Sequence, residues 1–389
     1  MPAFPLGAAV TGAQLDADPY AVFARLRPVE PVTWVPALGQ WLVTRRDIAM
    51  DVLRDPERFR TDSDRSPIRD SFGVQMLSVE GEDQRRFKTA CAPPFNTRAA
   101  NEARTAIAAA ADRQLAALAG RDRFEVRAEY AAPIALEMIA RTLGIPGELQ
   151  DALRGWYDTF VDALANYTRD PATRDRAHAA ARAFRTAMAP RLAAPDAADR
   201  SLLAQLVHGH PRVLDDEEIL SNLLIVLFGG IETTEGIIAN TLWALLLHPD
   251  ALARARADDA DLQRCVEESL RWEPAVQTCT RYTLAPVTLH GVEIPAGAVV
   301  QVMLGAMNRD PAHVADPDRF DPWREAAPHS AFGFGRHFCL GAALVRVEAE
   351  VALRRLLDAY PVLVLDPAGT SAPFGREFRK VGALTVRTG

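Results

Sequence analysis

Residues 332–341 read Phe332-Gly333-Phe334-Gly335-Arg336-His337-Phe338-Cys339-Leu340-Gly341. Cys339 comes directly before a predicted helix, where backbone N–H groups and the helix dipole favour a thiolate. Arg336 and His337 add positive potential, and the glycines allow the backbone to approach a flat or bulky group. Two interpretations of Cys339 follow: it is a ligand or nucleophile, or it is a buried structural thiol after a glycine-rich turn.

The overall composition limits the class of protein. The chain has 389 residues, of which 49% are hydrophobic and 24% charged, which excludes a disordered or collagen-like chain. The formal net charge of −7 argues against general nucleic-acid binding. Four cysteines without a C-x-x-C pair are too few for a disulfide framework, so we expect a reduced, cytoplasmic protein.

No membrane anchor is expected. Residues Met1 to Leu15 lack the basic and apolar stretches of a signal peptide. The most apolar stretch, Ile219 to Ile231, is shorter than the roughly 20 residues that cross a bilayer.

The segment Asp215 to His248 is the longest predicted helix. Acidic residues at its start suit the positive end of the helix dipole, and Pro249 ends it. Its middle, Leu223 to Ile231, is apolar nearly all round, which predicts burial. A helix of this length would extend about 51 Å, enough to cross the protein.

The remaining pattern predicts a mainly α protein with small β-sheets. Val32 to Thr44 is typical of a hairpin, and a last helix is expected over Leu340 to Tyr360. Further strands are expected at Val299 to Met303, Val362 to Leu365 and Ala383 to Val386. The segment Asn308 to Arg324, rich in Pro and Asp, is expected to be an irregular loop.

The run F-G-x-G-x-H-x-C-x-G at 332–341 resembles the haem-ligand loop of the cytochrome P-450 superfamily. Three more motifs follow that family's order: Glu268-Ser269-Leu270-Arg271, Gly229-Gly230-Ile231-Glu232-Thr233-Thr234, and the loop containing Asn308-Arg309-Asp310-Pro311. The resemblance extends from about Asp18 to Val386. It implies one P-450 domain over residues 1–389, with a β-rich N-terminal part at about 30–60, a helical bulk, and haem between the long central helix and the cysteine loop.

The same resemblance implies haem b (iron protoporphyrin IX), with the Cys339 thiolate as axial ligand and O₂ as co-substrate. Arg281 and His337 match positions that bind the haem propionates. Gln84 and Lys88 stand where many bacterial members carry His and Arg; Lys88 keeps the charge but loses bidentate geometry. The other implied haem contacts are Gly229, Gly230, Phe332, Gly333 and Gly341.

Glu232 and Thr233 are the implied catalytic residues. An apolar buried helix rarely holds an acid without a reason. Thr233 could hydrogen-bond the bound dioxygen while Glu232 relays protons to it, with Gly229 and Gly230 leaving room. The alternative is a helix kink with Thr233 bonded to a backbone carbonyl, and both can hold at once.

Two further sets of residues follow from the resemblance. Glu268 and Arg271, three apart on one helix face, are expected to form a buried pair that orders the loop behind the haem, joined by Arg324. The expected substrate contacts are Met76, Ile225, Phe228, Val276, Gln277 and Phe374. Core packing remains an alternative for Phe228.

The predicted function is a monooxygenase that hydroxylates or epoxidises a hydrophobic small molecule. Electrons are expected from a separate ferredoxin and ferredoxin reductase, supplied by NAD(P)H, and docking at a basic patch of Arg85, Arg86, Lys88, Arg336 and Arg346. Alternatives are phenol coupling, desaturation, peroxide-driven oxidation or a non-catalytic haem-binding protein. The sequence does not indicate the substrate, the regiochemistry or the oligomeric state.

Overall fold

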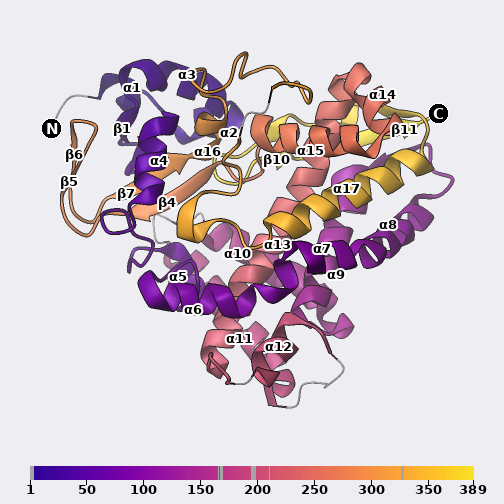
Figure 1. Cartoon of the computed structure of the whole chain (residues 1–389), viewed down its shortest axis with the longest axis horizontal. Helices are drawn as coiled ribbons and strands as arrows, with labels where there is room; N and C mark the ends of the chain where they lie inside the picture. Colours follow the sequence, from indigo (N-terminus) through magenta and orange to yellow (C-terminus); the bar gives the residue numbers. More distant parts are fainter. Residues whose placement is uncertain (1–3, 165, 167–169, 194–198, 210, 326–327) are drawn as a thin grey trace.

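A central helix organises the molecule, for which a computed structural model describes residues 4–164, 166, 170–193, 199–209, 211–325 and 328–389. Helix α13 (Asp216–Leu247) occupies the middle (Figure 1). The carboxylate of Asp215 accepts a hydrogen bond from the Glu218 N–H, and the Glu218 side chain bonds the Asp215 N–H in return. His248 ends the helix, so the bounds predicted from sequence are confirmed.

Helices α9 (Ala132–Leu143), α15 (Asp259–Trp272) and α17 (Ala342–Ala359) pack around α13. The predicted last helix is confirmed, although it starts at Ala342 rather than Leu340. Most side chains of α13 are buried, as its apolar sequence predicted.

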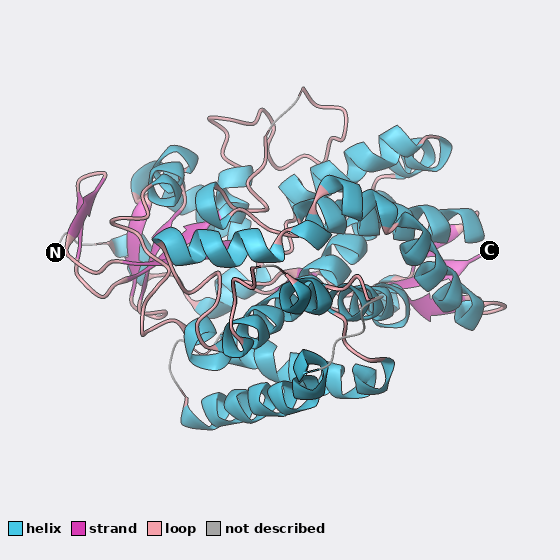
Figure 2. Cartoon of the chain, turned by 60° about the horizontal axis from the view of Figure 1, so that its bottom comes forward, coloured by secondary structure: helices cyan, strands magenta, loops and turns pink. Residues whose placement is uncertain are grey.

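The predicted N-terminal hairpin is confirmed as β1 (Val32–Val35) and β2 (Gln40–Val43). It is not a separate unit, because β2 pairs in parallel with β7 (Val299–Met303), which pairs with β4 (Thr278–Tyr282). The sheet order is β1-β2-β7-β4. Figure 2 shows the strands in two groups, at opposite sides of a helical body.

The second group contains the three-stranded sheet β3-β11-β8, and two-stranded pairs complete the β structure. The bounds are β3 Arg123–Glu125, β5 Val287–Leu289, β6 Val292–Ile294, β8 Leu363–Leu365, β9 Pro373–Phe374, β10 Lys380–Val381 and β11 Thr385–Thr388. Strand β11 therefore begins two residues later than the predicted strand.

The other helices are α1 Pro5–Ala8, α2 Gly12–Ala17, α3 Pro19–Val29, α4 Arg46–Arg54, α5 Pro67–Phe72, α6 Gly81–Cys91, α7 Thr97–Glu102, α8 Arg104–Leu118, α10 Gln150–Leu164, α11 Pro171–Ala193, α12 Leu202–His208, α14 Pro249–Ala257 and α16 Leu304–Asn308. Short 3₁₀ turns occur at Pro93–Phe95, Gly147–Leu149, Gly335–His337 and Pro367–Gly369, and a π turn at Arg127–Ala131.

Within the described residues, α13 is the one helix long and apolar enough to cross a membrane. In its most apolar window, 78% of the residues are buried inside the protein. The helix is long and apolar because it forms the core of the protein.

Candidate active site

A cavity of about 350 Å³ lies beside α13, and its wall is largely apolar. It brings together eleven residues predicted to bind the cofactor or react. These come from α6 (Gln84, Lys88), α13 (Gly229, Gly230, Thr233), β4 (Arg281) and the cysteine loop (Phe332, Gly333, His337, Cys339, Gly341). Elements distant in sequence thus build one site.

The cysteine loop is shaped by its glycines. Gly333 and Gly335 have φ of +70° and +75°, a left-handed backbone that favours glycine. The Cys339 N–H donates to the Phe332 carbonyl at 2.9 Å, which closes the loop. The Cys339 side chain is exposed towards the cavity.

The pKa of the Cys339 thiol shifts in the direction opposite to the sequence-based expectation. Burial raises this pKa, and the Gly341 N–H and the cations of Lys88 and Arg346 oppose that shift without cancelling it. A metal ion bound at the sulfur would favour the thiolate, because a coordinating thiol is deprotonated outright.

The cationic rim of the cavity suits a group that carries carboxylates. The buried Nδ1 of His337 has no hydrogen-bond partner among the described residues, and its Nε2 lies 3.1 Å from Glu80 Oε1. Lys88 Nζ donates to the carbonyls of Arg336 and Phe338, at 2.7 and 2.8 Å. Gln84 Nε2 donates to the Arg336 carbonyl at 2.9 Å. With Arg281, these donors would hold the two propionates of a haem, and Cys339 would supply its thiolate ligand.

Thr233 and the two glycines belong to the part of the wall that α13 contributes. Thr233 Oγ1 donates to the Gly229 carbonyl at 2.7 Å, which is the local alternative considered above, yet the helix continues without a break. A Cβ at Gly229 would meet no atom within 4 Å, so this residue leaves open space. Gly230 serves packing instead, because its Cβ would lie 2.5 Å from Ile139 Cδ1.

Glu232 does not line the cavity that contains Cys339, which corrects the placement predicted from sequence. It faces a second, polar cavity of about 290 Å³, where Lys380 Nζ lies 2.6 Å from its Oε1 and the Tyr157 hydroxyl donates to its Oε2. Lys380 also contacts Glu235. Consecutive helical residues point about 100° apart, and here that turn places Glu232 at the polar cavity and Thr233 at the cavity that contains Cys339.

The expected pair behind the cysteine loop is present. Arg271 Nη2 lies 2.8 Å from Glu268 Oε1, and Arg324 Nε lies 3.1 Å from the same oxygen. Arg271 also donates to the carbonyls of Asn308, Pro317 and Arg319, at 3.1, 2.8 and 3.1 Å. This side chain therefore joins α15 to the irregular segment that precedes the cysteine loop.

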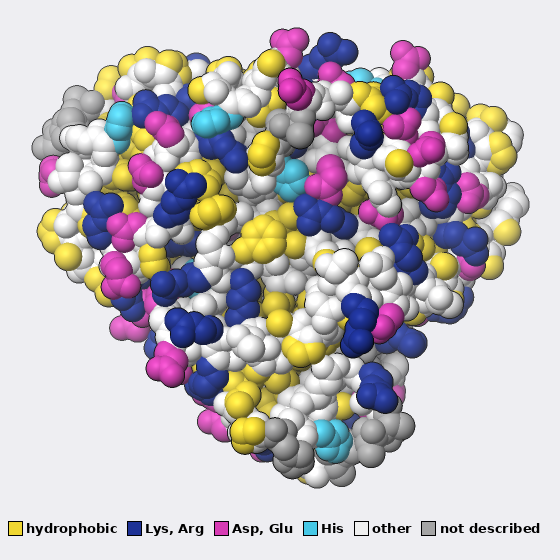
Figure 3. Space-filling model, viewed as in Figure 1, with side chains coloured by type: hydrophobic (Ala, Val, Ile, Leu, Met, Phe, Trp, Pro, Cys, Tyr) yellow, Lys and Arg dark blue, Asp and Glu magenta, His cyan; other side chains and the backbone are white. Residues whose placement is uncertain are grey.

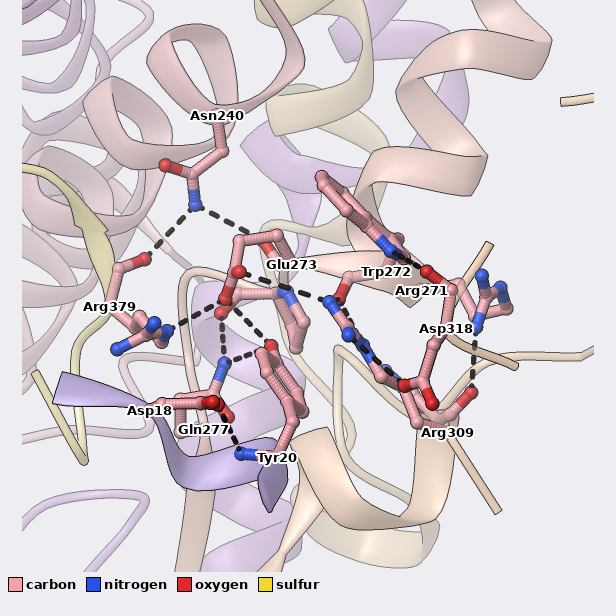
Figure 4. Close-up of polar contacts among 12 residues, drawn as sticks. Asp18, Tyr20, Asn240, Arg271, Trp272, Glu273, Gln277, Arg309, Asp318 and Arg379 are labelled. Atoms are coloured by element: carbon pink, nitrogen blue, oxygen red, sulfur yellow. Dashed lines mark hydrogen bonds and ion pairs between the residues drawn. The ribbon is translucent and has the colours of Figure 1, made fainter. Parts of the chain in front are cut away.

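Four of the six predicted substrate contacts line the cavity, namely Met76, Ile225, Phe228 and Val276. Gln277 does not, because its buried side chain turns to the Tyr20 hydroxyl and the Pro274 carbonyl, at 3.1 and 2.9 Å (Figure 4). Phe374 does not either, since it is 60% exposed on β9. These two predictions were wrong, because the Gln277 side chain is held by its own hydrogen bonds and Phe374 faces solvent.

Among the residues that line the cavity and that sequence reasoning missed are Glu348, Glu377 and Phe378. No motif marks them. Phe378 packs against Phe228 with ring centroids 5.3 Å apart, so Phe228 both packs against a neighbouring ring and lines the cavity.

The predicted basic patch is largely neutralised by acids. Arg86 pairs with Glu218, Arg346 with Glu267, and Arg336 with Glu80 at 3.4 Å. On the face of the molecule drawn in Figure 3, Lys and Arg side chains and acidic side chains both occur across the surface.

Known proteins resemble the chain over nearly its whole length. A family model described as Cytochrome P450 matches residues 172–377. Cytochrome P450 monooxygenase PikC of Streptomyces venezuelae is 37% identical over 379 residues, covering 94% of this chain and 89% of PikC. Cytochrome P450 107B1 of Saccharopolyspora erythraea is 33% identical over 392 residues, covering 96% of this chain and 95% of that protein.

Solved structures also resemble this chain. Myxobacterial cytochrome P450 CYP267B1 in complex with myristic acid is 31% identical and superposes with a TM-score of 0.87, covering 100% of each chain. Fold and site together define a haem-thiolate monooxygenase. The chain belongs to the cytochrome P450 family, whose cofactor is haem b with a cysteine thiolate ligand.

Proposed function

We propose that the protein inserts one oxygen atom from O₂ into a hydrophobic small molecule, by hydroxylation or epoxidation. The observation that carries this proposal is that Cys339 and Thr233 line one cavity whose wall is otherwise largely apolar. Such a wall buries apolar substrate surface and excludes water. A relative named 6-deoxyerythronolide B hydroxylase, 30% identical over 375 residues, supports hydroxylation.

Each residue at the site would have a distinct role. Cys339 Sγ would be the axial ligand, and Arg281, His337, Lys88 and Gln84 would hold the propionates. The bound haem supplies the activation of O₂, favoured by electron donation from the thiolate. Thr233 Oγ1 donates to the Gly229 carbonyl at 2.7 Å in the structure; after rotation away from that carbonyl, its hydroxyl would present a proton donor at the open space beside Gly229.

Glu232 would supply that proton after rotation of its side chain. In the structure the Glu232 carboxylate is held by Lys380 and Tyr157 at the polar cavity, whereas Thr233 lines the cavity that contains Cys339. Rotation about its side-chain bonds would carry a proton from the polar cavity towards Thr233 Oγ1. This arrangement favours the use of O₂ over peroxide-driven oxidation, which needs no such relay.

The electron donors would be a ferredoxin and its reductase, in the cytoplasm. Because the arginines of the predicted patch are mostly paired with acids, docking would rest less on net charge than the sequence suggested. Exposed Phe334 and Phe338, 39% and 44% exposed, would add apolar contact on the cysteine loop.

The test is Thr233→Ala in the haem-loaded protein with a ferredoxin system. Loss of the hydroxyl should lower product formed per electron consumed by about tenfold or more, while haem content and substrate affinity stay unchanged. Thr241→Val is the matched control, because Thr241 is buried on the same helix outside the cavity. Unchanged coupling in Thr233→Ala would contradict the mechanism.

A further inference from the structure

Glu377 places a carboxylate in the wall of the largely apolar cavity. Its backbone is fixed, because the Gln277 N–H donates to the Glu377 carbonyl at 2.8 Å and the Arg379 N–H donates to the Ala275 carbonyl at 2.8 Å. Val276 and Phe378, between these bonds, form an antiparallel bridge. The side chain of Glu377 is therefore held at the cavity by an ordered segment.

This carboxylate has no hydrogen-bond or ion-pair partner in the described part of the chain. The two flanking cations turn elsewhere: Arg376 Nη1 lies 3.1 Å from Asp16 Oδ2, and Arg379 Nε lies 2.9 Å from Glu273 Oε1 (Figure 4). Burial raises the pKa of Glu377 to about 7; the charge of Arg376 opposes this shift only in part, and the charge of Asp16 adds to it. An acid is costly in such a place unless something bound there pairs with it.

The other charged groups at the cavity have assignments of their own. Arg281, His337 and Lys88 lie at the rim that suits the propionates. Glu348, the second acid in the wall, accepts a hydrogen bond from Thr234 Oγ1 at 3.2 Å. Glu377 is thus the acidic group in the described wall that is left for a ligand.

We propose that Glu377 selects a substrate that carries a positively charged amine, pairing its carboxylate with the ammonium while the apolar wall binds the rest of the molecule. This inference rests on the proposed function, since the ligand it describes is the substrate of that reaction. A neutral or anionic molecule of equal size would leave the buried carboxylate without a partner, and an anion would also be repelled.

The test compares three probes with one ten-carbon chain: decyltrimethylammonium, 1-decanol and decanoate. A quaternary ammonium cannot coordinate iron, so the comparison isolates the charge. Binding to the haem-loaded full chain is measured by calorimetry and by the shift of the Soret band. The cation should bind at least about 30-fold more tightly than the alcohol, as expected when a buried charge gains its partner, and decanoate should bind most weakly.

Glu377→Gln should remove this preference by weakening the binding of the cation, without weakening the binding of 1-decanol. Glu377→Asp, which keeps the charge, should retain part of it. Glu348→Gln is the matched control, because it removes an acid from the same wall, and it should retain the full preference. Equal affinity for cation and alcohol in the unaltered protein, or a preference that survives Glu377→Gln, would overturn the proposal.

Failure of the proposed function would look different. Its sign would be a reduced carbon-monoxide complex without the red-shifted Soret band of a thiolate-ligated haem. Calorimetric affinities for the three probes do not depend on turnover, so they decide the role of Glu377 in either case.

Discussion

Glu348 is a buried acid that keeps its proton at neutral pH. Burial raises its pKa from 4.5 to about 8, and the hydrogen bond from Thr234 opposes this only in part. Between these two values the unfolded chain has lost a proton that the folded chain retains. The contribution of Glu348 to stability is therefore complete at low pH and declines as the pH rises towards about 8.

Glu348→Gln should remove that decline, because glutamine keeps the shape and cannot ionise. We expect the variant to be more stable than the unaltered protein by on the order of a few kcal/mol at about pH 8, and little different at about pH 4. Urea unfolding of the haem-loaded proteins at both pH values measures this. A difference that is the same at both would show that the ionisation of Glu348 does not affect stability.

At the level of residues, the sequence predicted the chemistry better than the directions of side chains. The loop 332–341 could be assigned because its glycines, its histidine and Cys339 have fixed spacing. Gln277 and Phe374 were misassigned, since Gln277 is held by Tyr20, which is distant in sequence, and Phe374 lies exposed on β9. The sequence could not single out Glu377. What distinguishes this residue is that the neighbouring Arg376 and Arg379 pair with other acids.

Among the elements, α9 and α13 make a close contact that requires one of two adjacent glycines. A Cβ at Gly230 would lie 2.5 and 2.6 Å from Ile139 Cδ1 and Cγ1, and one at Gly229 would meet nothing within 4 Å. A sequence motif cannot separate these roles, because they depend on which side of α13 faces α9.

Gly230→Ala should lower the free energy of unfolding by about 1–3 kcal/mol, because the new methyl group overpacks the helix contact. Gly229→Ala is the matched control: it should raise stability by roughly 0.5–1 kcal/mol through helix propensity while narrowing the cavity. Denaturant unfolding and substrate-induced spectral shifts separate the two effects. Equal destabilisation by both substitutions would refute the packing argument, whereas recovery in Gly230→Ala combined with Ile139→Ala would support it.

Across the whole molecule, Arg271 connects parts of the chain that local sequence does not connect. It is buried and bonds Glu268 together with three carbonyls of residues 308–319. The resemblance to the family predicted the buried Glu268–Arg271 pair and its role in ordering the loop, but not those carbonyls, because the loop that supplies them has no periodic pattern.

Arg271→Lys should weaken haem retention, because one ammonium cannot replace the planar guanidinium that reaches all these acceptors. We expect haem content after gel filtration to fall by half or more (about 1–3 kcal/mol of lost interaction). Arg264→Lys is the matched control, since Arg264 is exposed on the same helix. Full haem content in Arg271→Lys would show that the loop is ordered without this side chain.

The buried cluster in Figure 4 has a consequence for the order of events during synthesis. Tyr20 on α3 donates to Glu273, which pairs with Arg379, and Arg379 also bonds the Ala17 carbonyl across a separation of 362 residues. Contacts at such separation form only after the distant segment has left the ribosome. The first helices therefore lack these contacts, and stay partly exposed, until nearly the whole protein has been translated. During this interval chaperones and proteases would compete for the nascent chain.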